Sequence, residues 1–283
     1  MTKALILGGG GVAGVAWEAG VVTGLARGGV DLRDADLIVG TSAGSVVGTL
    51  IAADADLERF VVHQAAVDPA LDSMTVPAPG ADPMAAFAIL ADQTLDPAEA
   101  RRRVGAMAMA APVAANGERL IALGEQLPVK KWPDRRLLIT AVEVESGARK
   151  VWERDSDVPL ASAVASSCTV PCIFPPVRIG DHHYMDGGVY SDTNADLAAG
   201  ASAAVVLDPM GYVLPRESLR RELDALGTDN HTVVTPDAAA AKVFGENVLD
   251  PALWRPAFDA GLAQAQQVRD AVAEVWHGRR DAR

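Results

Sequence analysis

Cysteine, aromatic residues and positive charge are all scarce in this chain of 283 residues. Its two cysteines, Cys168 and Cys172, exclude a disulfide framework, and their C-x3-C spacing favours two small buried thiols over a redox pair. Lysine and arginine total 25 against 37 aspartates and glutamates, which gives a formal charge of −12. Nucleic-acid binding depends on clustered cationic side chains, so we predict no nucleic-acid partner, and electrostatic docking on anionic membranes is disfavoured.

Long apolar runs are also missing, and none is long enough to span a bilayer. Residues 1–7 have the short cationic head and apolar body of a signal peptide, but four consecutive glycines at positions 8–11 interrupt them. This favours a strand followed by a loop. We therefore expect a cytoplasmic protein, although a secretion route without a cleaved signal leaves no trace in a sequence. With 49% hydrophobic and 22% charged residues, the composition is that of a soluble globular chain.

The first fifty residues predict a βαβ unit. Ala4–Leu7 is a short apolar run typical of a buried parallel strand, a helix is expected from about Val12 to Arg27, and Asp36–Gly40 is the second strand. The carboxyl ends of neighbouring parallel strands meet at one edge of a sheet. The glycine loop after the first strand and Ser42 after the second should therefore lie close together.

Gly40-Thr41-Ser42-Ala43-Gly44 stands where the second strand stops and a helix-like run begins. In such an elbow the middle residue adopts a strained conformation, and flanking glycines let strand and helix pass closely. The helix N-terminus favours an anion beside the hydroxyl group. The motif indicates a nucleophilic serine; the alternative is a glycine-flanked helix cap.

A nucleophilic serine needs a base, and the five histidines, at positions 63, 182, 183, 231 and 277, are poor candidates. An α/β-hydrolase has several strands before its elbow and orders its triad as Ser, acid, His, whereas this elbow follows one strand and one helix. Asp186 is the better partner, because Gly187 and Gly188 permit a tight turn that aims its carboxylate. It could accept the Ser42 proton directly. The alternative is a solvated Asp-Gly turn.

The glycine loop supplies a third component. Consecutive glycines expose backbone N–H groups in concave arrangements that bind anions, and beside a nucleophilic serine such a loop forms an oxyanion hole. Gly9, Gly10 and Gly11 are the predicted donors.

The rest of the chain predicts a single domain over residues 1–283, because it shows no repeat and no linker. Residues 68–128 are expected to form a helical insertion over the strand ends, either as ordinary core helices or as a mobile lid, and residues 215–277 a helical C-terminal segment. The predicted insertion helices are Pro83–Ala91, Pro97–Ala111 and Ala115–Gln126, and the later ones are Pro159–Ser167, Asn194–Ala199, Pro215–Leu226, Pro236–Leu249 and Pro251–Trp276. Strands are expected at Arg136–Val144, Arg149–Glu153 and Ala203–Leu207, the last of these being the final strand, with an extended stretch at Val170–Val177.

Taken in order, the Gly-Gly-Gly-x-x-Gly loop, Gly-Thr-Ser-Ala-Gly, Phe174-Pro175-Pro176-Val177 and Asp186-Gly187-Gly188 resemble the patatin-like phospholipases, over about residues 4–53 and 159–200. The resemblance implies a three-layer α/β/α sandwich with a mostly parallel central sheet. It implies an acyl-ester hydrolase that works through an acyl-enzyme, without metal or cofactor. Its nucleophile would be Ser42 and its base Asp186, with oxyanion donors in the glycine loop. The expected partner is a lipid or other acyl ester, with transient contact with membranes or lipid aggregates.

One departure from the family pattern concerns Ala13, because relatives usually carry arginine or lysine just before the last glycine of the loop. Loss of that cation removes a possible phosphate contact, which favours ester hydrolysis in general over a phospholipid preference.

Three alternatives remain. Gly9-x-Gly11-x-x-Gly14 fits a dinucleotide-binding fingerprint, but Asp36 lies at the wrong end of the second strand to bind a ribose. Asp181, His182 and His183 with Asp186 could form a metal cluster, although adjacent strand residues point to opposite faces. A catalytically silent, lipid-binding relative is the third alternative.

Overall fold

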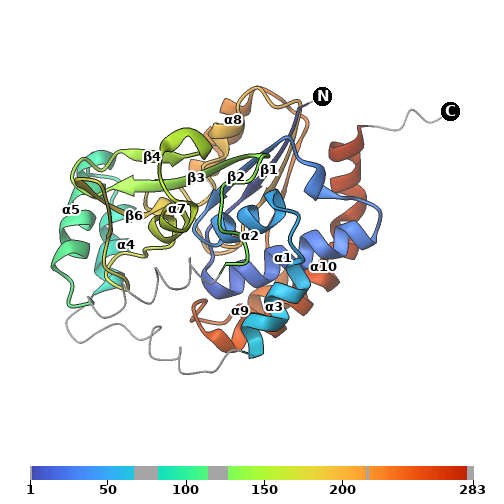
Figure 1. The fold of residues 1–283 in the computed structure, drawn as a ribbon, viewed down its shortest axis with the longest axis horizontal. Helices are drawn as coiled ribbons and strands as arrows, with labels where there is room; N and C mark the ends of the chain where they lie inside the picture. The colour runs from blue at the N-terminus through green and yellow to red at the C-terminus, as the bar shows by residue number, and fades with distance from the viewer. Residues whose placement is uncertain (1, 67–81, 114–126, 215–216, 279–283) are drawn as a thin grey trace.

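A mixed sheet forms the centre of the computed structural model, which describes residues 2–66, 82–113, 127–214 and 217–278 (Figure 1). Its eight strands follow the order β5-β6-β3-β2-β1-β7-β8, with β4 paired to β3. They are β1 (Lys3–Leu7), β2 (Leu37–Thr41), β3 (Arg136–Glu143), β4 (Arg149–Trp152), β5 (Val177–Ile179), β6 (His182–Asp186), β7 (Ala203–Leu207) and β8 (His231–Val234). The β3-β2-β1-β7-β8 portion is parallel, while β4, β5 and β6 join antiparallel. The predicted mostly parallel sheet is confirmed.

Helices cover both faces of this sheet (Figure 1). Leu5 and Leu7 of β1 belong to a core shared with α1, α2 and α10, whereas Ala4 and Ile6 pack toward α8 and the 3-10 turn Ala195–Ala198. The helices are α1 (Gly11–Arg27), α2 (Ala43–Ala52), α3 (Leu57–Ala66), α4 (Pro83–Ala91), α5 (Pro97–Ala110), α7 (Leu160–Ser167), α8 (Glu217–Leu226), α9 (Ala238–Phe244) and α10 (Trp254–His277). Burial on both faces explains why β1 lacks polar alternation. The α/β/α layering is as predicted.

The N-terminal βαβ unit joins β1, α1 and β2. Its parallel strands pair with Leu7 opposite Gly40. The N–H of Gly44 donates to Gly8 O at 2.9 Å, and a Cβ on Gly44 would lie only 2.1 Å from Leu7 O. Helix α2 therefore starts directly against the end of β1, and only glycine fits at position 44.

Helices α4 and α5 match the predicted insertion helices closely. Asp82 and Asp96 cap them, accepting from Ala85 N at 2.8 Å and Glu99 N at 3.0 Å, and each helix has proline in its first turn. They pack through a small apolar cluster against the β3–β6 edge of the sheet. The predicted helix at Ala115–Gln126 lies outside the described residues.

Three predictions are wrong. The last strand is β8, since residues 231–234 pair in parallel with β7. The helix predicted over 236–249 is confined to α9, because Gly245 takes a φ of 61° there. Residues 170–174 form a hydrogen-bonded turn rather than an extended stretch: Phe174 N donates to Val170 O, and Cys172 adopts a φ of 63°.

The C-terminal helix α10 lies across α1 (Figure 1). A Cβ on Gly20 would lie 2.2 Å from Phe258 O, and one on Gly261 would lie 2.3 Å from Trp17 O. Small residues on both helices thus allow a close crossing. Within the described ranges, no helix combines the length and the apolar character needed to cross a membrane.

Candidate active site

Ser42 occupies the elbow between β2 and α2. Its φ of 51° and ψ of −115° place it in a conformation that non-glycine residues avoid, which is the strain expected of an elbow serine. Its N–H donates at 2.9 Å to Oγ of Ser167, the last residue of α7. The strained backbone is therefore fixed by a contact from a distant segment, one that sequence reasoning missed.

Asp186 ends β6 and lies against Ser42. The Ser42 hydroxyl donates to Asp186 Oδ2 at 2.8 Å, and Gly188 N donates to Oδ1 at 2.8 Å. Gly187 packs on β3, where a Cβ would lie 2.3 Å from Thr140 Oγ1. Both side chains of the pair are buried, with exposed fractions of 7% for Ser42 and 5% for Asp186. The structure thus brings the predicted nucleophile and base together.

The electrostatic setting of Asp186 suits a base. Burial raises the pKa of its carboxyl group to about 7, while the bonds from Gly188 and Ser42 act in the opposite direction. A carboxylate with a pKa near neutrality can take a proton and return it within one reaction cycle.

The predicted oxyanion donors differ in whether their N–H groups already have an acceptor within the fold. Gly9 N donates to Asp192 O at 2.9 Å, so its N–H is committed within the fold. In the described part of the chain, the N–H groups of Gly10, Gly11 and Ala43 have no acceptor. The N–H of Ala43 begins helix α2 and directly follows the serine, which is a common place for an oxyanion donor.

A buried amide ties the loop after Asp186 to the neighbouring strands. Asn194, in a left-handed conformation, places Nδ2 2.6 Å from Ser191 O, 3.1 Å from Thr41 Oγ1 and 3.3 Å from Thr140 Oγ1. Its Oδ1 accepts from Arg149, which also pairs with Asp196. The turn carrying Asp186 is therefore anchored to β2 and β3. No short motif could have shown this, because its members are far apart in the sequence.

Both cysteines are free thiols. Cys168 lies under the elbow, with Sγ 3.4 Å from Ser42 O and 3.6 Å from Ser45 Oγ. Burial raises the pKa of the Cys168 thiol to about 12, and the nearby Asp186 adds to the effect. Cys168 is thus protonated and inert at neutral pH.

The histidines have other neighbours. His182 and His183 lie at the far end of β6 and place Nδ1 3.1 Å from Glu143 and 2.8 Å from Glu145, respectively. Glu143, Glu145 and His182 could together offer three metal ligands. That group includes neither Asp181 nor Asp186, so the alternative cluster suggested by the sequence does not form in the structure. His231 contacts Thr228 O at 3.0 Å.

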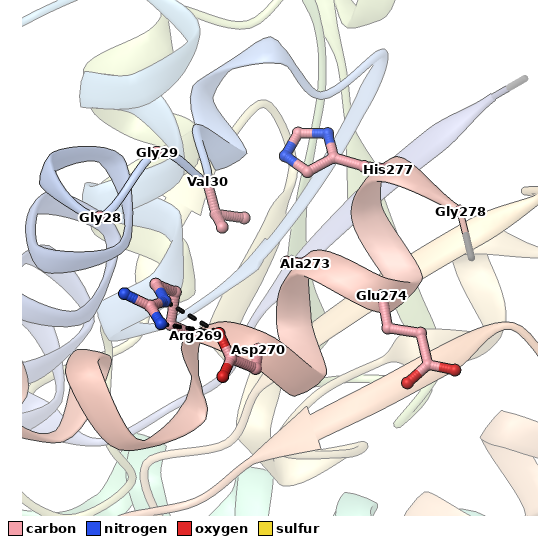
Figure 2. A pocket seen from close by; sticks show the side chains of 9 residues that line it. All are labelled: Gly28, Gly29, Val30, Arg269, Asp270, Ala273, Glu274, His277 and Gly278. Carbon is pink, nitrogen blue, oxygen red and sulfur yellow. Dashed lines mark hydrogen bonds and ion pairs between the residues drawn. The ribbon is translucent and has the colours of Figure 1, made fainter. Parts of the chain in front are cut away.

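A hollow of about 560 Å³ lies between the C-terminal end of α1 and the last turns of α10 (Figure 2). Figure 2 shows an ion pair between Arg269 and Asp270 on one side and His277 on the other. Ser42 and Asp186 are not among its lining residues, so this hollow is separate from the serine site.

The fold is of the α/β class, with a central sheet flanked by helices, and it holds a strained elbow serine hydrogen-bonded to a buried aspartate. The family model Patatin-like phospholipase matches residues 5–199, which is more than half of the sequence. The chain therefore belongs to the patatin-like phospholipase family, whose members are lipid hydrolases.

The solved structures similar to the chain include VipD and ExoU. VipD from Legionella pneumophila is 15% identical, with a TM-score of 0.48, over 95% of this chain and 67% of its own. The type III effector protein ExoU is 17% identical, with a TM-score of 0.37, over 94% of this chain and 53% of its own. The chain thus spans about half the length of ExoU. No curated protein matches it significantly.

Proposed function

We propose that this protein is a serine lipid acyl hydrolase that cleaves carboxylic esters through an acyl-enzyme on Ser42. The observation that carries the proposal is the 2.8 Å hydrogen bond between Ser42 Oγ and Asp186 Oδ2, within a family-matched fold. In the first half-reaction, Asp186 takes the hydroxyl proton as Ser42 attacks the ester carbonyl, and the departing alkoxide then takes that proton. In the second half, Asp186 activates a water that releases the carboxylic acid.

The negative charge that forms on the carbonyl oxygen needs donors. We assign this task to the N–H groups of Gly10 and Gly11, with Ala43 as an addition to the sequence-based set. Gly9 is left out because its N–H is bonded to Asp192 O. Each such donor can be worth a few kcal/mol in the transition state.

Substrate class is proposed as acyl esters broadly, with no special preference for phospholipids. Ala13 takes the place of the usual basic residue, and its side chain is fully buried while its N–H donates to Val248 O at 2.9 Å. Position 13 therefore holds no cation for a phosphate group. Contact with lipid aggregates is part of the proposal, because the two packed helices α4 and α5 both expose large apolar side chains: Met84 at 74% and Phe87 at 48% on α4, and Met109 at 49% on α5.

The test is labelling of the purified protein with a fluorophosphonate, followed by mass mapping of the modified peptide and by assay of p-nitrophenyl ester hydrolysis. We expect the label on Ser42 and loss of hydrolysis, by at least ~1,000-fold, in Ser42→Ala and Asp186→Asn. Ser146→Ala is the matched control, because this serine is exposed and remote from the elbow. Wild-type turnover by Ser42→Ala would refute the assignment. A folded protein that neither labels nor hydrolyses esters would favour the silent lipid-binding relative.

A further inference from the structure

Asp192 borders the Ser42–Asp186 pair, and the reaction described above does not use it. A Cβ on Gly9 would lie 3.6 Å from Ser42 Cβ and 3.7 Å from Asp192 Oδ1. A Cβ on Gly188 would lie 3.1 Å from Asp186 Oδ1 and 3.5 Å from Asp192 Oδ1. One oxygen of Asp192 therefore borders both the glycine loop and the turn that carries the base.

The backbone of Asp192 is part of the same arrangement. Its carbonyl oxygen accepts the Gly9 N–H at 2.9 Å, which fixes the start of the glycine loop. Any shift of the segment that carries Asp192 therefore moves the proposed oxyanion donors as well. Both the side chain and the main chain of Asp192 therefore lie against the glycine loop beside Ser42.

The other side of Asp192 faces further carboxyl groups. It shares a cavity of about 30 Å³ with Asp208, closed by Leu214 and Leu219, a volume that suits one water molecule. Asp192 is half-buried, and desolvation of its carboxyl group raises its pKa to about 8; the charges of Asp208 after β7, Asp186 on β6 and Glu222 on α8 add to this. All three of these charged neighbours are acidic, so the negative charge on each of them favours the protonated form of Asp192.

A second carboxylate at this place would oppose the reaction. Acylation moves negative charge onto the carbonyl oxygen held by the glycine loop, and a nearby fixed negative charge raises the energy of that state. We propose that Asp192 is a positioning residue whose neutral carboxyl group keeps the oxyanion side free of negative charge, and that its ionisation switches off acylation of Ser42. This inference rests on the proposed function.

The experiment measures the second-order rate of fluorophosphonate labelling at Ser42 between about pH 5.5 and pH 9.5. The wild-type rate should rise up to about pH 7 and fall about tenfold per pH unit above about pH 8. In Asp192→Asn the labelling rate should still rise up to about pH 7 but should no longer fall above about pH 8. Asp192→Ser, a smaller neutral replacement, serves if the asparagine variant does not fold. Asp181→Asn is the control, since it makes the same change in an exposed turn of the β5–β6 hairpin and should behave as wild type.

Two results would overturn the inference. One is an unchanged alkaline fall in the neutral variants. The other is loss of labelling at every pH in a variant whose unfolding temperature matches wild type, because the carboxyl group itself would then be required. Wild-type protein that never labels at Ser42 overturns the proposed function instead, and this inference with it.

Discussion

At the scale of single residues, ionisation of the proposed base, Asp186, sets the pH dependence of hydrolysis on the acid side. Asp186 must be ionised to accept the Ser42 proton, and burial holds its pKa at about 7. Below that value the ionised fraction falls tenfold per pH unit. We therefore expect the kcat/KM of ester hydrolysis to fall on the acid side of its maximum, by about tenfold for each pH unit below about pH 6.

A pH–rate profile with p-nitrophenyl acetate checks this, with the pH dependence of the unfolding temperature as a control for loss of fold. A profile that is flat down to pH 5, with the protein still folded, would contradict the assignment of Asp186 as base.

Glu18 on α1 is a second buried acid and has no function in the proposed reaction. Its side chain is fully buried, and neither carboxyl oxygen has a hydrogen-bond partner among the described residues. Burial raises its pKa well above the ordinary value, the nearby backbone of Gly8 acts in the opposite direction, and the charge of Asp208 adds to the rise. The folded state thus holds a proton that the unfolded chain releases.

Because of this raised pKa, Glu18 destabilises the folded state at high pH. Stability falls as pH rises above the unfolded-state pKa of glutamate, and continues to fall until the folded-state pKa is reached. We expect Glu18→Gln to leave the free energy of unfolding nearly unchanged at pH 4.5 and to increase it at pH 8. Urea unfolding at the two pH values measures this, and equal effects at both would show that Glu18 is ionised in the fold.

At the scale of elements, the contact between β1 and α2 depends on Gly44. An added Cβ would meet Leu7 O at 2.1 Å, and backbone atoms cannot move as a side chain can. Gly44→Ala should destabilise the fold by about 3 kcal/mol or more and lower activity further by tilting the elbow.

Thermal and urea unfolding give the stability, and the fluorophosphonate rate gives the elbow geometry. Gly28→Ala is the matched control: its φ is −82°, and its Cβ would meet the flexible Arg269 side chain at 3.0 Å and Leu25 O at 3.3 Å, a far looser backbone contact than that at Gly44. If both variants lose the same free energy of unfolding, the contact with Leu7 O is not what excludes alanine from position 44.

Elements whose signals are local could be predicted from the sequence. Asp82 and Asp96, each followed by proline, set the starts of α4 and α5, and the glycines around Ser42 set the elbow. Strand β8 was missed because its four residues mix polar and apolar side chains and are mostly half-buried. The bond from Gly9 to Asp192 and the support from Ser167 join segments far apart in the chain, so no local pattern indicates them.

At the scale of the whole molecule, the matched family region does not contain the complete core. The match ends at residue 199, before β7, β8 and α10. Strand β7 pairs with β1 along its whole length, and α10 buries Phe258 and Trp276 completely against the N-terminal helices. The Trp276 indole donates to Asp34 Oδ1 at 2.7 Å, and that of Trp17 to Gln264 at 2.9 Å. The two ends of the chain therefore stabilise each other.

A chain ending at residue 199 should for this reason fail to fold cooperatively, although it retains Ser42 and Asp186. Without β7, the strand that leads into the glycine loop becomes a sheet edge, and the apolar face of α1 is left uncovered; both are conditions that favour aggregation. Circular dichroism during heating and limited proteolysis measure the effect, with a chain ending at residue 278 as control. A cooperative transition in the shorter chain, together with labelling of Ser42, would show that the C-terminal elements cover a core that is already stable.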